Sequence, residues 1–378
     1  MTSKFDAIRP YDDSDLPFIL NRLIANDVLL ARLVAFRFSA WPKFIYPFIR
    51  FLTRRYIKKR MLSIHTMREF QGLVEPYMQR MINTTTTDFN VSGFEQLDLS
   101  KPCLFISNHR DIALDPAFIN WALHLNGQDT VRIAVGDNLL STDWVTDLIR
   151  LNKCFIVNRR AKDRRQKLAD AKLLSEYIAF SLIEDQQHIW IAQREGRAKD
   201  GNDLTNPAII SMLALNKPKE KNFACYINEL RIVPVSISYE FDPCDLTKAQ
   251  ELQEIETSGS YDKADHEDLK SIAGGVVGNK GQVHVNFGRM LNDGFNNAKE
   301  VAEHLDKQIL DGYQIFATAK VAASLLAGDK QHDLQLSAQD IAVATEYLNA
   351  RTEGLSNEVK EKVLNMYAKP WLKKLASS

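Results

Sequence analysis

An alternation of short apolar runs with amphipathic segments, from residue 89 to residue 287, is the strongest constraint on the fold of this chain. Short apolar runs bounded by polar residues are consistent with buried strands. They lie at residues 89–97, 103–107, 131–135, 154–157, 188–191, 231–239 and 282–287. Between them, helical periodicity occurs at residues 116–125, 144–151, 163–183, 207–215 and 246–255. The pattern predicts an α/β fold with a mainly parallel sheet flanked by helices.

Helical patterns dominate on both sides of this region. From Leu16 to Phe38, apolar residues recur at helical spacing, which predicts one helix, and residues 299–375 are also predominantly helical. The polar run from Thr84 to Thr87 has the composition of a linker. The sequence therefore predicts an N-terminal helical region (1–87), an α/β domain (88–298) and a C-terminal helical region (299–378).

Charge and cysteine usage narrow the class of protein. The chain has 48 basic and 48 acidic residues, and this balance argues against a nucleic-acid-binding protein. Its cysteines lie far apart without metal-ligand spacing, which favours reduced, buried thiols in a cytoplasmic protein and no metal site. They are Cys103, Cys154, Cys225 and Cys244. Because no apolar run reaches the length of a membrane span, we expect any membrane contact to be peripheral.

The stretch from Phe36 to Arg60 interleaves aromatic residues with arginine and lysine. This composition suits the interface of an anionic bilayer, where rings lie at headgroup depth and cations meet phosphate. The same residues could instead pack a helical domain whose cations are solvated. Both interpretations remain open at the level of the sequence.

A glycine-rich segment at residues 274–281 lacks the Lys-Ser/Thr ending of a phosphate-binding loop. It also precedes an apolar run instead of following one. The segment is therefore expected to be a turn into the last strand.

The segment from Phe105 to Asp115 carries the first candidate chemistry. An apolar run ends in Asn-His-Arg-Asp and leads into a predicted helix, so His109 lies at a strand-to-helix junction. Histidine titrates near neutral pH and can act as a general base when a carboxylate orients its ring. Asp111 and Asp115 are both candidates for that carboxylate.

Cationic residues follow two further apolar runs. Arg159 comes after residues 154–157, and Glu195-Gly196-Arg197 comes after residues 188–191. In a parallel sheet the carboxyl ends of the strands share one edge, so these groups could converge on His109. Guanidinium groups donate parallel hydrogen bonds to phosphate, each worth about 1.5–3 kcal/mol. The sequence therefore predicts a phosphorylated substrate with a reactive hydroxyl group.

At these positions the chain resembles the glycerolipid acyltransferase family. The resemblance extends from about Phe89 to Tyr239 and rests on four ordered blocks. They are Asn108-His109-Arg110 with Asp115, Phe155 to Arg159, Glu195-Gly196-Arg197 and Val233-Pro234-Val235. Two departures are visible: five residues, instead of the family's four, separate histidine from aspartate, and Arg197 directly follows Gly196 where the family has Glu-Gly-x-Arg.

The resemblance implies direct transfer of an acyl group from acyl-coenzyme A or acyl carrier protein, with no permanently bound cofactor. His109, oriented by Asp115 or Asp111, would be the general base for a glycerolipid hydroxyl. Arg159 and Arg197 would bind the acceptor phosphate, and the turn at Glu195 and Gly196 would support the oxyanion. The implied acceptor is glycerol 3-phosphate or lysophosphatidic acid. Another lysolipid acceptor, or an inactive lipid- or phosphate-binding protein on the same fold, is the alternative.

Overall fold

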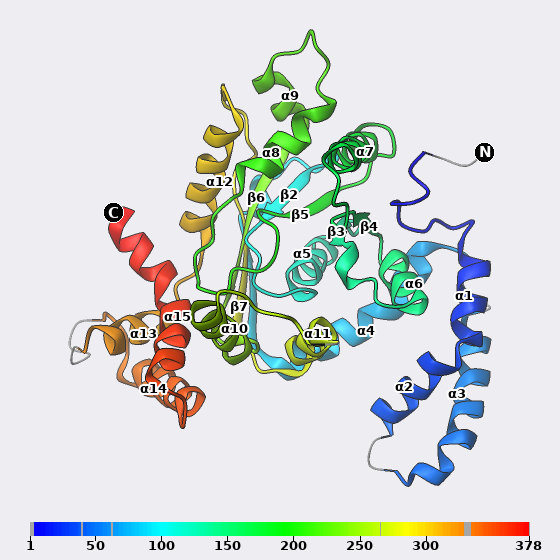
Figure 1. Cartoon of the computed structure of the whole chain (residues 1–378), viewed down its shortest axis with the longest axis horizontal. Coiled ribbons are helices and arrows are strands. Elements are labelled where there is room, and N and C mark those ends of the chain that lie inside the picture. The colour runs from blue at the N-terminus through cyan, green and yellow to red at the C-terminus, as the bar shows by residue number, and fades with distance from the viewer. Residues whose placement is uncertain (1–3, 39–40, 62, 265, 329–333, 378) are drawn as a thin grey trace. The chain divides into compact units, whose positions relative to one another are not determined.

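The computed structural model describes residues 4–38, 41–61, 63–264, 266–328 and 334–377 (Figure 1). The chain divides into two compact units. The larger unit contains residues 80–131 and 174–378, and the smaller unit contains residues 1–79 and 132–173.

The sheet of the larger unit has the strand order β1-β7-β6-β2-β5. Its strands are β1 (Thr86–Ser92), β7 (Gly281–Phe287), β6 (Ile232–Tyr239), β2 (Leu104–Ser107) and β5 (Ile189–Ala192). Neighbouring strands are parallel except β6 and β7, which are antiparallel. Every residue of β2 and β6 is buried, because helices cover both faces of a parallel sheet. The predicted α/β fold with a mainly parallel sheet is confirmed.

Helices pack against this sheet on two sides. Figure 1 shows α5 and α12 on opposite sides of β6 and β7, and α12 contacts β6 while α5 contacts β7. The helices between and after the strands are α5 (Leu114–Leu125), α8 (Pro207–Leu213), α9 (Phe223–Glu229), α10 (Asp245–Ser258), α11 (Glu267–Val277) and α12 (Ala298–Gly312). Because β2 is parallel to both β5 and β6, the carboxyl ends of these three strands lie at one edge of the sheet.

The last helices belong to the same unit as the sheet. They are α13 (Ala317–Ala327), α14 (Ala338–Thr352) and α15 (Asn357–Ser377). Their apolar faces form a core with Ala249 of α10. The buried carboxylate of Asp245 joins α10 to this core, because it accepts hydrogen bonds from Arg351 and from the Tyr367 hydroxyl at 2.9 Å.

The smaller unit combines N-terminal helices with a parallel pair of strands. Its elements are α1 (Leu16–Ala25), α2 (Asp27–Arg37), α3 (Tyr46–Met61), the first part of α4 (Met67–Thr85), β3 (Arg132–Gly136), α6 (Asp143–Leu151), β4 (Cys154–Val157) and the first part of α7 (Arg164–Ile183). Apolar side chains of α1, α4 and α6 form one core. No helix among the described residues is long and apolar enough to cross a bilayer.

Four details of the sequence interpretation are wrong. Asn26 divides the helix predicted from Leu16 to Phe38, since its extended backbone ends α1 and its side chain accepts from Leu29 N at 2.9 Å to begin α2. Residues 84–87 are not a linker, because α4 continues to Thr85 and β1 begins at the next residue. Of the glycine-rich segment, residues 274–277 are helical and only 278–280 turn. Cys225 is exposed, unlike the other cysteines.

Candidate active site

The turn between β2 and α5 begins with Asn108, whose side chain forms the hydrogen bonds that the backbone of a strand residue would form. Asn108 is fully buried, and its amide donates to Ile237 O at 3.0 Å and accepts from Ile237 N at 2.8 Å. These two bonds continue the pairing of β2 with β6 beyond Ser107 and Val235. Because both groups of the amide are occupied, the position of the next residue, His109, is fixed.

His109 forms a hydrogen bond with Asp115. Its Nδ1 atom lies 2.8 Å from Asp115 Oδ2, with 14% of the histidine side chain exposed and none of the aspartate. Asp115 also accepts from the backbone N–H groups of Arg110 at 2.6 Å and Asp111 at 3.0 Å, and from the Tyr239 hydroxyl at 2.7 Å. A carboxylate held from so many sides keeps one orientation. With Nδ1–H directed at Asp115, the other ring nitrogen, Nε2, is available as a base.

Asp111 has a different role in this turn. Its Oδ1 atom accepts from Ala113 N and Leu114 N at 2.9 Å each, so it caps the first turn of α5. Burial and the nearby Asp115 raise the pKa of the Asp111 carboxyl group. Because α5 starts only at Leu114, the loop before it absorbs the additional residue between His109 and Asp115. The structure thus puts Asp115, and not Asp111, against His109.

Trp190 of β5 supports the ring of His109. The two rings meet edge to face with 5.8 Å between their centroids, and Trp190 Nε1 donates to Ser107 Oγ at 2.9 Å. Sequence reasoning missed Trp190 and Tyr239 as neighbours of His109. The one available signal was the position of Tyr239 at the carboxyl end of β6, whereas Trp190 is the second residue of β5.

The Glu195-Gly196-Arg197 loop runs beside His109. Ala198 N donates to His109 O at 2.8 Å, which ties the backbone of this loop to the backbone of the histidine. Gly196 has a φ of +71°, a conformation that glycine adopts without strain, and Glu195 is exposed. Arg197 is half-buried and its Nη1 donates to Ser271 Oγ at 2.7 Å. No carboxylate of the described residues lies within ion-pair distance of Arg197.

Arg110 differs from Arg197 because its charge is neutralised within the fold. It is buried, and its Nε and Nη2 atoms donate to Asp203 Oδ2 at 3.1 and 2.6 Å. Burial alone would lower the pKa of Arg110, but Asp203 outweighs it and the pKa lies above its usual value. The backbone of Arg110 is held as well, since the buried Lys248 donates to Arg110 O at 2.7 Å and pairs with Asp242. Arg110 therefore stabilises the turn and is not free to bind an anion.

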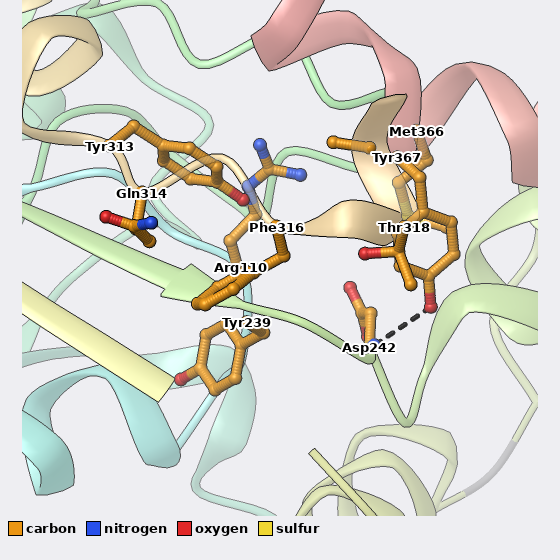
Figure 2. A pocket seen from close by; sticks show the side chains of 10 residues that line it. Arg110, Tyr239, Asp242, Tyr313, Gln314, Phe316, Thr318, Met366 and Tyr367 are labelled. Carbon is orange, nitrogen blue, oxygen red and sulfur yellow. Dashed lines mark hydrogen bonds between the residues drawn. The ribbon is translucent and has the colours of Figure 1, made fainter. Parts of the chain in front are cut away.

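A pocket lies behind this turn (Figure 2). It is lined by Arg110, Tyr239, Asp242, Tyr313, Gln314, Phe316, Thr318, Ala319, Met366 and Tyr367. Its volume of about 20 Å³ is enough for a water molecule and far too small for a lipid. The pocket is therefore part of the support of the site. Among the described residues, no group of three or more His, Cys, Asp or Glu side chains is arranged to hold a metal ion.

Arg159 follows β4 and belongs to the smaller unit. Its backbone N–H donates to Asp137 Oδ1 at 3.2 Å, and its exposed side chain passes close to Gly136, where a Cβ atom would lie 3.0 Å from the guanidinium carbon. Its predicted contact with an acceptor phosphate stays a prediction.

One family model and one solved structure are similar to parts of this chain. A family model described as acyltransferase matches residues 88–238, a range that includes the His109 turn, Arg159 and the Glu195-Gly196-Arg197 loop. No curated protein matches the chain significantly. A similar solved structure is the 1-acyl-sn-glycerophosphate (LPA) acyltransferase PlsC from Thermotoga maritima. It has 14% sequence identity and a TM-score of 0.36 over 79% of this chain and 91% of that chain.

Proposed function

We propose that this chain is a glycerolipid acyltransferase, which moves a fatty acyl group from a thioester to a hydroxyl group of glycerol 3-phosphate or lysophosphatidic acid. The acyltransferase match at residues 88–238 supports the proposal. The hydrogen bond between His109 and Asp115 at the end of β2 is the observation that carries the proposal. It leaves an oriented, partly exposed imidazole in a turn that is otherwise rigid. Such a group is suited to removing a proton from an alcohol.

In the proposed reaction, Nε2 of His109 takes the proton of the acceptor hydroxyl as its oxygen attacks the thioester carbonyl. Asp115 orients the ring and stabilises the imidazolium that forms. The tetrahedral intermediate then expels the thiolate, which receives the proton from His109, so the base is regenerated. General-base catalysis of this kind contributes roughly 10²–10⁴ to the rate. Backbone N–H groups of the turn at Glu195 and Gly196 are proposed to stabilise the oxyanion.

Arg197 is proposed to bind the acceptor phosphate. A half-buried guanidinium without a carboxylate partner favours an anionic ligand, and Arg197 follows the strand next to β2. Arg110, in the turn that carries His109, is already paired with Asp203. Arg159 is proposed as a second phosphate ligand, on the basis of its position after an apolar strand in the resembling sequence block.

The acyl donor is proposed to be acyl-coenzyme A or acyl carrier protein, which the thioester chemistry requires as a co-substrate. No permanently bound cofactor enters the proposed reaction, because the leaving thiolate and His109 together balance the proton.

We further propose peripheral attachment to the membrane at its cytoplasmic face, through residues 36–60. Ser39 and Ala40 lie outside the described residues. Phe48 and Phe51 are three positions apart on α3 and are 65% and 62% exposed, and Phe44, in the turn just before α3, is 82% exposed. The same helix carries arginine and lysine at Arg50, Arg54, Arg55, Lys58, Lys59 and Arg60. Exposed rings beside cations favour the bilayer-interface interpretation over packing inside a helical domain.

The decisive test is an acylation assay with purified protein. Labelled acyl-coenzyme A and acyl carrier protein thioesters are offered with glycerol 3-phosphate, lysophosphatidic acid and other lysolipids, and the His109→Ala variant is the control. We expect thioester-dependent product with a phosphate-monoester acceptor and none from the variant. Product only from another lysolipid would assign a different acceptor, and binding of acceptor without any product would assign the inactive binding protein.

A further inference from the structure

Helix α11 lies outside the matched domain and yet contacts two parts of the candidate site. On one side, a Cβ atom at Gly275 would lie 2.3 Å from Asp111 Oδ2, so this residue packs directly on the turn that precedes α5. One helical turn earlier, Ser271 Oγ accepts the hydrogen bond of 2.7 Å from Arg197 Nη1. The helix therefore touches both the histidine turn and the proposed phosphate ligand.

The contact with Ser271 determines which edge of the planar Arg197 guanidinium group can bind a ligand. Arginine has five N–H donors in one plane, and its Nε and Nη2 edge can donate two parallel bonds to phosphate. Ser271 binds Nη1, on the far side of that edge. A neutral hydroxyl orients the group without cancelling its charge, whereas the Asp203 carboxylate at Arg110 does both.

Ser271 is itself held in place by its neighbours. The Cys244 sulfur atom, directly before α10, lies 3.4 Å from Ser271 Oγ and 3.6 Å from Ser271 O. Cys244 is buried, and the first turn of α10 also carries Asp245, which the C-terminal helices bind. The hydroxyl is thus fixed by a well-packed segment and not by a mobile loop.

We infer that Ser271 is a positioning residue, which orients Arg197 so that its Nε–Nη2 edge binds the phosphate of a phosphate-monoester acceptor. This inference rests on the proposed function. It assigns part of acceptor selection to α11, a helix beyond the matched domain. A lysolipid whose phosphate is a diester presents one fewer ionisable oxygen to this edge and is expected to bind less well.

The kinetic test compares Ser271→Ala with Ser271→Thr, which keeps a hydroxyl group. Loss of one hydrogen bond to Arg197 should raise the acceptor KM about three- to tenfold, with little change in the donor KM, and threonine should restore most of it. In an Arg197→Ala background, Ser271→Ala should have no further effect. An unchanged acceptor KM in Ser271→Ala, or equal effects with and without Arg197, would overturn the inference while leaving the acyltransferase proposal intact.

A binding measurement without catalysis separates the two proposals. Inorganic phosphate should raise the Tm of the wild-type protein, raise it less in Ser271→Ala, and not raise it in Arg197→Ala. Cys225→Ala, at the exposed cysteine of α9, is the control and should respond to phosphate as the wild type does. If the wild type and Ser271→Ala respond equally to phosphate, Ser271 does not position Arg197, whether or not the protein acylates any acceptor.

Discussion

His109 Nδ1 lies 2.8 Å from Asp115 Oδ2, although five residues separate the two in the sequence. On a continuous helix, residues six positions apart lie on different faces. The pair meets because the histidine is in a loop and the aspartate is in the first turn of α5, which begins at Leu114. The loop between them is fixed by Asp111, whose carboxylate caps the helix.

This relationship predicts that replacing Asp115 by asparagine lowers activity much more than replacing Asp111 by asparagine. Asp115→Asn places an amide where the His109 ring and two backbone N–H groups donate, so we expect kcat/KM to fall by roughly 10²-fold or more, approaching His109→Ala. Asp111→Asn retains an oxygen that can accept from Ala113 and Leu114, so its activity should stay within a few-fold of wild type. Steady-state kinetics with thermal unfolding as a folding control measure both. A larger loss in Asp111→Asn would reverse the assignment.

Substitution of Arg110 is predicted to lower the stability of the protein, whereas substitution of Arg197 is predicted to weaken acceptor binding. Arg110→Met leaves the largely buried carboxylate of Asp203, 11% exposed, without its partner, and breaking a buried pair typically costs about 3–5 kcal/mol. Arg197→Met removes a half-buried cation bound to a hydroxyl, so the free energy of unfolding should change by less than about 1 kcal/mol while the acceptor KM rises. Urea unfolding and acceptor titrations test this. Loss of stability in Arg197→Met would show that the arginine is structural.

The sequence predicts the sheet well, because β2 and β6 are buried on both faces and appear as continuous apolar runs. It could not choose between Asp111 and Asp115, since that choice depends on where α5 begins, and helix boundaries are the least certain feature of a periodic pattern. It also missed Lys248 and Ser271. Their contacts with Arg110 and Arg197 join residues 138 and 74 positions apart, and no local periodicity records such a bond.

Gly275 and Gly274 provide a matched pair of substitutions on α11. Replacing a helical glycine by alanine normally stabilises a protein by up to about 1 kcal/mol, and Gly274 has no atom within 4 Å of its would-be Cβ. Gly274→Ala is therefore expected to raise the Tm or leave it unchanged. At Gly275 the same Cβ would lie 2.3 Å from Asp111 Oδ2, so α11 or the turn must shift. We expect Gly275→Ala to lower both Tm and kcat, and equal behaviour of the two variants would contradict this packing.

The exposed aromatic face of α3 predicts attachment to anionic vesicles. Each buried aromatic side chain is worth about 1.5–3 kcal/mol, so the double variant Phe48→Ser and Phe51→Ser should lose at least tenfold in vesicle affinity. Tyr77→Ser, at another exposed aromatic residue, is the matched control and should bind as the wild type does. Flotation with vesicles that contain phosphatidylglycerol measures binding, which should weaken as salt rises. Unchanged flotation of the double variant would exclude α3 as the attachment site.

The buried amine of Lys280 is expected to make the free energy of unfolding depend on pH in the alkaline range. Its side chain is fully buried and donates to Thr85 Oγ1 and Gly278 O, both at 2.8 Å, and burial lowers the pKa of Lys280 from 10.5 to about 8. Below pH 8 both the folded and unfolded states bind the proton, so the folded state carries the whole cost of burying the charge. Between pH 8 and 10.5 only the unfolded state binds it, and stability from this residue therefore rises with pH.

The gain for Lys280 approaches roughly 3 kcal/mol across this interval, by the usual conversion of a pKa difference into free energy. Lys280→Met has no group to titrate there, so the difference in unfolding free energy between wild type and variant should move in favour of the wild type as the pH rises. Urea unfolding at about pH 7.5 and about pH 9.5 measures it, with Lys270→Met, at an exposed lysine, as the control that should follow the wild type. If the difference in unfolding free energy between the wild type and Lys280→Met is the same at both pH values, the buried amine remains protonated throughout.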